Sequence, residues 1–92
     1  MLEGSYKAAK GLIKVKAEVK SGHLSEIHIS GDFFMHPEEQ LNNLESALKG
    51  SPIEENMLKK GVLDFFKSTG CILVGVTPES FIHVIKMSLE SQ

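Results

Sequence analysis

The single cysteine, Cys71, is the residue of this chain with the plainest capacity for chemistry. A stabilised thiolate at this position could act as a nucleophile or as a sulfur acceptor. Its neighbours Ile72, Leu73 and Val74 are apolar, however, and they predict a buried, inert thiol. One thiol also makes no internal disulfide, CxxC pair or multi-cysteine metal site. Chemistry at Cys71 is therefore kept only as an alternative hypothesis.

The histidines do not form a recognisable metal-binding or catalytic pattern. No two of them are spaced as HxH or HxxxH, so a metal site would need residues brought together by the fold. The four positions are His23, His28, His36 and His83. No Ser-His-Asp or Cys-His arrangement and no glycine-rich phosphate loop can be recognised. We expect ordinary surface histidines, no bound metal, and no catalysis by this chain alone.

The basic residues limit the kinds of ligand that the chain could bind. All ten are lysines, and the formal net charge is −2. Bidentate clamps on phosphate or carboxylate usually require arginine, so a complete nucleotide-binding catalytic centre is not expected. A net charge close to zero gives no indication of nucleic-acid binding. Half of the lysines lie within the first twenty residues: Lys7, Lys10, Lys14, Lys16 and Lys20.

The run Gly31-Asp32-Phe33-Phe34 joins a predicted strand to a predicted helix and is the most distinctive stretch of the chain. Glycine at a strand end permits a positive φ or a close backbone approach. Asp32 is expected to accept hydrogen bonds from nearby backbone N–H groups in an Asx-type turn. Adjacent aromatic side chains point in different directions, so one could enter the core while the other meets a partner. A purely structural corner is the alternative, and the sequence does not decide which phenylalanine faces outward.

A β-hairpin precedes this run. Apolar residues alternate with charged ones from Gly11 to Lys20, and again around Ile27 and Ile29, as in half-buried strands. A two-residue loop at 21–22 would oppose Val15 to His28, so we predict a three-residue loop of Lys20, Ser21 and Gly22. The predicted pairs are Val19 with His23, Val15 with Ile27, and Ile13 with Ile29. Residues 1–10 could be an extended lead-in or a short edge strand.

Three helices are predicted after the junction. The first begins at Pro37 with Leu41, Leu44 and Leu48 facing inward, and the second covers about 54–67 with Gly61 inside it. The third begins at Thr77-Pro78. Expected inward residues of the last two helices are Leu58, Val62, Phe65, Phe66, Phe81, Ile82, Ile85 and Leu89. The run 71–74 is ambiguous between a third strand and a buried connector.

The elements together predict one α+β domain over residues 1–92. A small antiparallel sheet, made of a hairpin and a possible third strand, is packed by three helices. The apolar fraction of 41% and charged fraction of 24% are those of an ordinary globular protein. No apolar run is long enough to cross a bilayer and no signal peptide is recognised, so a cytoplasmic protein without membrane contact is expected.

Several of these motifs occur together in the C-terminal domain of lipoate-protein ligases, and the chain resembles that domain over essentially its whole length. The motifs are the lysine-rich entry 7–11, Leu12-Ile13, Ile29-Ser30-Gly31-Asp32-Phe33-Phe34, Pro37-Glu38-Glu39, Leu44-Glu45-Ser46-Ala47-Leu48-Lys49-Gly50 and Gly75-Val76-Thr77-Pro78-Glu79-Ser80-Phe81. The Gly-Asp-Phe-Phe-x-x-Pro-Glu-Glu run is the most specific of them. The family's domain is also similar in fold to iron–sulfur scaffold and sulfur-acceptor proteins.

The resemblance implies a function that this chain would share with a larger protein. In that family a large catalytic domain holds ATP, lipoate and the catalytic lysine, and the small domain caps it and moves during the reaction. The two domains are separate polypeptides in some organisms. A chain that starts at Met1 near the domain's edge and lacks the large domain resembles the small subunit of such a bipartite ligase, although an excised domain would read in the same way.

The implied reaction is lipoate plus ATP giving lipoyl-adenylate and pyrophosphate, then transfer of the lipoyl group to a lysine of a lipoyl-domain protein. Magnesium, ATP and lipoate would be held in the heterodimer with the catalytic subunit, with no cofactor bound by this chain alone. The resemblance points to Gly31, Asp32, Phe33 and Phe34 as the partner-facing cap. Lys7 and Lys14 are weaker candidates for supporting the adenylate phosphate.

Two alternatives remain open from the sequence. A sulfur-acceptor or iron–sulfur-assembly-like protein would use Cys71, but cluster scaffolds need several cysteines. A plain interaction module, dimerising through a sheet edge, is the other. Preference for lipoate or octanoate and the identity of the acceptor protein are not encoded in any recognisable motif.

Overall fold

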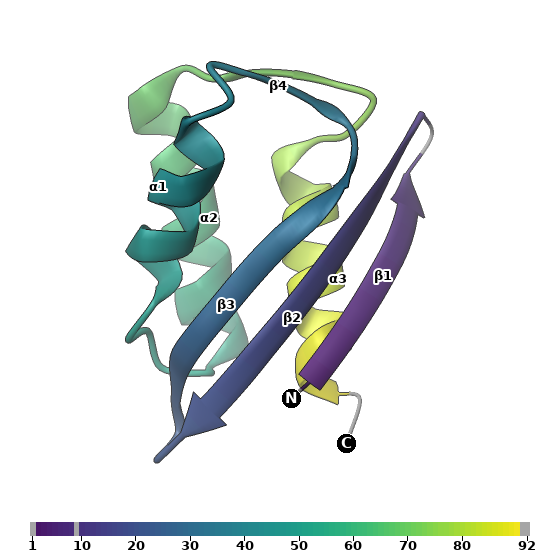
Figure 1. Cartoon of the computed structure of the whole chain (residues 1–92). Coiled ribbons are helices and arrows are strands. Elements are labelled where there is room, and N and C mark those ends of the chain that lie inside the picture. Colours follow the sequence, from purple (N-terminus) through teal and green to yellow (C-terminus); the bar gives the residue numbers. More distant parts are fainter. Residues whose placement is uncertain (1, 9, 91–92) are drawn as a thin grey trace.

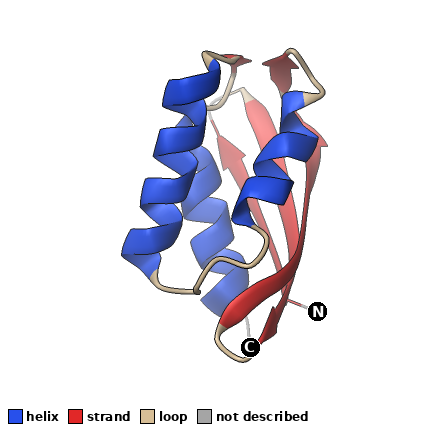
Figure 2. Ribbon diagram, turned by 90° about the vertical axis from the view of Figure 1, so that its left-hand side faces the viewer, coloured by secondary structure: helices blue, strands red, loops and turns tan. Residues whose placement is uncertain are grey.

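The chain folds into three layers, with a sheet on one side and three helices on the other. A computed structural model describes residues 2–8 and 10–90. The sheet contains β1 (Leu2–Ala8), β2 (Gly11–Lys20) and β3 (His23–Asp32). Figures 1 and 2 show all three helices on the same face of this sheet. Helices α3 and α1 pack on the strands, and α2 packs on these two helices from outside. The predicted α+β class with an antiparallel sheet and three helices is confirmed.

The sheet is antiparallel in the order β1-β2-β3, so the N-terminal segment is an edge strand. This settles the open choice between a lead-in and a strand for residues 2–8. The alternation of side chains matches the prediction: Ile13, Val15 and Ala17 of β2 are buried, with Ile27 and Ile29 of β3. The third strand of the main sheet is thus β1 and not the run 71–74.

The predicted hairpin register between β2 and β3 is wrong, by two residues at Val15 and by one residue at Val19. The loop has two residues, Ser21 and Gly22, with φ values of 54° and 77°, as a type I′ turn requires. Lys20 opposes His23, while Val15 opposes Ile29. Strict alternation seemed to forbid this loop, but a bulge beside Glu18 and Val19 shifts the register and restores apolar pairing. The bulge also turns Leu24, which the sequence reading had not placed in the core, fully inward.

The helices follow the predicted order with shifted boundaries. They are α1 (Gln40–Leu48), α2 (Glu55–Thr69) and α3 (Pro78–Glu90). The first begins three residues after the predicted start at Pro37. The carbonyls of residues 37–39 each accept a hydrogen bond from the N–H three residues later, which is the pattern of a 3₁₀ turn before the α-helix. Glu38 and Glu39 therefore precede the helix and do not lie in its first turn. Gly70, with φ of 63°, ends α2 as expected.

Gly61 lies inside α2 without any packing need for glycine. A Cβ built at this position would be 3.5 Å from the Leu48 Cδ2 atom, which is ordinary van der Waals contact. We expect Gly61→Ala to raise the free energy of unfolding by up to about 1 kcal/mol, because alanine has the higher helix propensity. Urea unfolding followed by circular dichroism measures this, and a loss of stability would show that the helix needs the closer approach.

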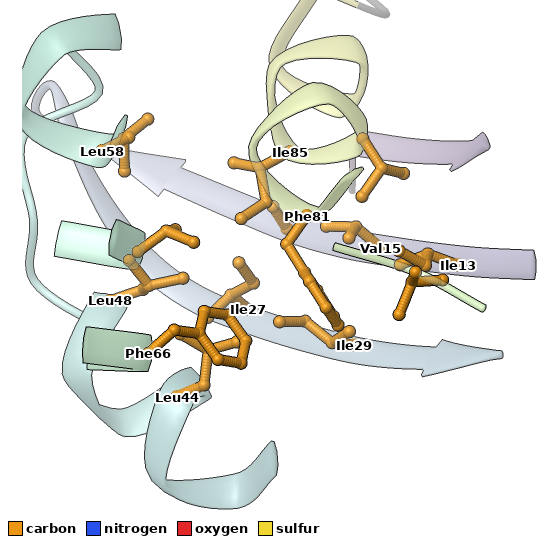
Figure 3. Close-up of a cluster of buried hydrophobic side chains, with 14 of the residues drawn as sticks. Ile13, Val15, Ile27, Ile29, Leu44, Leu48, Leu58, Phe66, Phe81 and Ile85 are labelled. Carbon is orange, nitrogen blue, oxygen red and sulfur yellow. The ribbon is translucent and has the colours of Figure 1, made fainter. Parts of the chain in front are cut away.

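The core lies between the sheet and the helices, with Phe81 of α3 at its centre. Its ring is fully buried and lies edge-on to Phe33 and tilted against Phe66, with centroids 5.3 and 5.4 Å away. Figure 3 shows Phe81 among Ile29 and Val15 of the sheet and Phe66 of α2.

Thr77 caps α3 as predicted, in a reciprocal pair of hydrogen bonds with Ser80. Of the other predicted inward residues, Leu41, Phe65, Ile82 and Leu89 are only partly buried, whereas Val84 was missed.

The outer edge of β3 is covered by the segment that contains α1. The backbone N–H of Ile29 donates to the Glu45 carboxylate at 2.6 Å, and Leu24 exchanges backbone hydrogen bonds with residues 50 and 51. Lys49 lies 2.9 Å from Glu26 and holds the pKa of the Glu26 carboxyl below its ordinary value. That ion pair is exposed and contributes little, so the covering of the edge depends on the other contacts.

Glu45 is therefore expected to contribute to stability. Glu45→Ala leaves the Ile29 N–H without its acceptor, and we expect a loss of about 1.5–3 kcal/mol in urea unfolding. Glu45→Gln keeps an acceptor oxygen and should lose less. Glu39→Ala is the matched control, since Glu39 is exposed and makes no side-chain cap bond. Equal stability of the Glu45 and Glu39 alanine variants would contradict this role.

None of the described helices is long and apolar enough to span a membrane.

Candidate functional site

A two-stranded ribbon, separate from the main sheet, lies at one end of the domain. It consists of β4 (Phe34–His36) and β5 (Ile72–Val74), which pair antiparallel. Phe34 opposes Val74, Met35 opposes Leu73, and His36 opposes Ile72. The ambiguous run after Gly70 is thus a strand, but its partner is the segment just after the Gly-Asp-Phe run. Two stretches far apart in the sequence thus lie side by side (Figure 1).

One face of this ribbon is apolar and open to solvent. Met35 points into the core and Leu73 packs against the core. Because side chains alternate along a strand, the residues on either side of Met35 and of Leu73 point outward. Phe34, Ile72 and Val74 are 55%, 57% and 55% exposed. The fourth outward residue, His36, stacks its ring parallel to Phe34 with centroids 6.4 Å apart. We call Phe34, His36, Ile72 and Val74 the ribbon face.

An exposed apolar cluster of this kind is a mark of an interaction surface. Scattered exposed apolar side chains are common, but neighbouring ones on paired strands form a contiguous patch. Aromatic residues are enriched where proteins bind one another, and histidine beside phenylalanine adds a polar atom at the patch. The ribbon also holds the patch on paired backbone, so little ordering is needed for contact.

The structure decides which of the two adjacent phenylalanines faces outward. Phe33 is partly buried and its ring packs edge-on against Phe81, whereas Phe34 belongs to the ribbon face. Gly31 and Asp32 end β3 and are both exposed. The Asp32 carboxylate makes no hydrogen bond to a described residue, so the predicted Asx-type turn is not formed. The run therefore contains two exposed residues that end β3, one partly buried ring and one outward-facing ring.

Gly31 has a structural role that no other residue can fill. Its φ is 146°, and a Cβ built there would collide with the carbonyl of Leu12 on β2. This close approach lets β3 end against β2 before the chain turns into the ribbon. Gly31 thus positions Phe33 and Phe34, and its own contribution to any contact would come from its backbone.

The two candidate lysines lie on the outer face of the sheet, which the helices leave uncovered. Leu12 of β2 opposes both Lys7 on β1 and Asp32 on β3, so these three form one row across the sheet. Lys14 lies in the next row of this face, between Ser5 and Ser30. Both lysines are exposed. With strands 4.7–4.9 Å apart, Lys7 and Asp32 backbones are separated by roughly 10 Å. The row lies at the end of β3 that leads into the ribbon.

Cys71 is not buried as the sequence predicted, but partly exposed. Its Sγ atom lies 3.1 Å from the Thr69 hydroxyl oxygen, just before β5 begins. A shallow hollow beside it is lined by Phe66, Lys67 and Pro78, among others. The prediction failed because its apolar neighbours Ile72 and Val74 face solvent on the ribbon. Among the described residues, no group of three His, Cys, Asp or Glu side chains could hold a metal.

The residues that sequence reasoning missed are Ile72 and Val74. Periodicity left this apolar run of four residues ambiguous between a third strand and a buried connector, and neither alternative exposes two of its side chains on an uncovered face. The missing information was tertiary: β5 pairs only with β4, and one side of that ribbon has no covering element among the described residues.

Comparison with known proteins identifies relatives over nearly the whole chain. The family model described as "Bacterial lipoate protein ligase C-terminus" matches residues 2–85. The chain is 42% identical over 87 residues to lipoate-protein ligase A subunit 2 of Thermoplasma acidophilum, covering 95% of this chain and 89% of that protein. It is also similar to a solved chain with a TM-score of 0.84 and 41% identity, covering 92% of this chain and 94% of that one. That structure is described as an archaeal lipoylation system, a bi-partite lipoate protein ligase and its E2 lipoyl domain from Thermoplasma acidophilum.

Proposed function

Because the chain belongs to the bacterial lipoate-protein ligase C-terminal family, we propose that it is the accessory subunit of an ATP-dependent, two-subunit lipoate-protein ligase. Its partner would be a separate catalytic subunit that holds ATP, magnesium and lipoate. The observation that carries the proposal is the ribbon face, an exposed apolar surface built on the most specific motif of the family resemblance.

The ribbon face would be the contact with the catalytic subunit. Phe34 supplies the largest side chain of the patch, and Ile72 and Val74 flank it from the neighbouring strand. Burying such side chains is favourable by about 25 cal/mol for each Å² of apolar surface removed from water. Gly31 and Phe33 would act indirectly, by fixing the backbone that presents Phe34.

The reaction that this complex would carry out begins with activation of lipoate. A lipoate carboxylate oxygen attacks the α-phosphorus of ATP, which forms the mixed anhydride lipoyl-adenylate and releases pyrophosphate. The lipoyl group is then transferred to the ε-amino group of a lysine in a lipoyl-domain protein, with release of AMP. The anhydride hydrolyses readily, so a subunit that closes over it would protect it by excluding water and fix the geometry of the reactants.

The charged residues beside the ribbon would supplement that contact. Lys7 and Lys14 extend from the uncovered sheet face, and the Lys7 row ends at Asp32, just before the ribbon. An ammonium group close to the adenylate would stabilise its phosphate charge as a point charge. Lys7 and Lys14 remain candidates for that role, and Asp32 a candidate for a polar contact at the rim of the interface.

The direct test is lipoate-dependent ATP–pyrophosphate exchange by the catalytic subunit from the same source, with and without this chain. We expect exchange to rise on addition of the chain and the chain alone to show none. Full exchange by the catalytic subunit alone would contradict the proposal. In that case the sulfur-acceptor alternative would be tested next, by alkylation of native Cys71, which is partly exposed.

A further inference from the structure

The outer edge of β1 is the open edge of the main sheet. At the opposite edge of the sheet, the segment around α1 covers β3 and forms hydrogen bonds with the backbone of Leu24 and Ile29. No described residue pairs with the outer edge of β1, which Figure 1 shows at the margin of the sheet. An edge strand of seven residues offers unpaired backbone N–H and C=O groups to another strand.

We propose that this edge pairs with the β1 edge of a second copy of the chain, antiparallel about a two-fold axis at Ser5. Directly opposed residues share a face of the sheet, so their numbers in such a pair must add to an even total. When Ser5 opposes Ser5 of the second copy, Glu3 opposes Lys7 and Lys7 opposes Glu3. Two oppositely charged pairs thus form on the same outer face.

The other residues of the strand also fit this register. On the inner face Leu2 opposes Ala8, and Gly4 opposes Tyr6. On this face Ser88 of α3 already covers Gly4, and Tyr6 is held edge-on to His83 of the same helix, with ring centroids 4.5 Å apart. Shifting the strands by two residues in either direction places neither Glu3 nor Lys7 opposite a charged residue of the second copy, and Glu3 then keeps only its exposed pairing with Lys16 of β2, at 3.7 Å. The charges of β1 therefore favour the register centred on Ser5 over the two neighbouring registers, and they match the β1 edge of a second copy of the chain.

A cysteine at the axis tests the geometry. In a Cys71→Ser background, Ser5→Cys would place two thiols directly opposite each other, where Cα atoms are about 4.5–5.5 Å apart and a disulfide can form. We expect mild oxidation to convert Ser5→Cys into a covalent dimer. Ser30→Cys is the matched control, because Ser30 is equally an exposed serine of the outer sheet face but lies on β3. Equal cross-linking of the two variants would overturn the proposal.

Charge reversal tests whether the pairs of Glu3 with Lys7 between the two copies stabilise the dimer. Sedimentation equilibrium at up to about 1 mM protein should detect a weak dimer, since one strand pair buries little surface. Lys7→Glu or Glu3→Lys alone opposes like charges twice and should raise the dissociation constant roughly tenfold. The double variant Glu3→Lys/Lys7→Glu restores both pairs and should restore the affinity. A strictly monomeric wild type, or a dimer that neither single reversal weakens, would overturn the proposal.

Discussion

Phe34→Ala is expected to weaken binding of the chain to a catalytic subunit by about tenfold to a hundredfold. Interface aromatic residues that are truncated to alanine commonly cost about 2 kcal/mol or more when they fill a buried site in the complex. Phe34 is the largest side chain of the ribbon face and more than half exposed in the free chain. Isothermal titration calorimetry with the catalytic subunit gives the dissociation constant.

Met57→Ala is the matched control for this measurement. Met57 is 47% exposed and lies on α2, far in the fold from the ribbon, so its truncation removes a similar apolar side chain elsewhere. We expect unchanged binding for Met57→Ala and unchanged folding for both variants by circular dichroism. Equal affinity of the Phe34→Ala variant and the wild-type chain for the catalytic subunit would show that the partner binds another surface.

Gly31→Ala is expected to destabilise the fold by about 3 kcal/mol or more. The new Cβ would collide with the Leu12 carbonyl, and alanine rarely adopts a φ of 146°. Because the collision is with backbone, β3 must move away from β2 or the end of the strand must open. Urea unfolding measures the loss, and exposure of the ribbon residues to proteolysis should increase with it.

Gly22→Ala is the comparison for a positive φ without a collision. Gly22 has a φ of 77° in open space, so its alanine variant reports the backbone strain without any collision. We expect Gly22→Ala to cost about 1 kcal/mol, well below Gly31→Ala. Equal effects at the two positions would mean that the close approach of β3 to β2 does not restrict residue 31.

The regular elements of this fold could be predicted because their signals are local. Alternation at Ile13, Val15 and Ala17 indicated a half-buried strand, and Thr77 before Pro78 indicated a helix start. The register of the β2–β3 hairpin could not be predicted in this way. A bulge changes which residues oppose one another, and no single residue type in the sequence indicates that a bulge is present. A strict alternation rule then predicts the wrong loop length.

The candidate site could be predicted only in part. The motif from Gly31 to Phe34 indicated where to look, because two adjacent aromatic side chains point in different directions and one of them could face a partner. The other half of the ribbon face could not be located from the sequence, since Ile72 and Val74 are about forty residues away and the run 71–74 was ambiguous between a strand and a buried connector. Their exposure depends on β5 pairing with β4 at the margin of the fold, where only one side is packed.

Hydrogen–deuterium exchange of the chain, with and without the catalytic subunit, tests most directly whether the ribbon face is the contact surface. Peptides that cover 33–37 and 71–76 should become protected on complex formation, because both strands would be buried against the partner. The outward side of α2, which includes Met57, should exchange at its free rate. Protection of α2 with no change in the ribbon peptides would contradict the proposed surface.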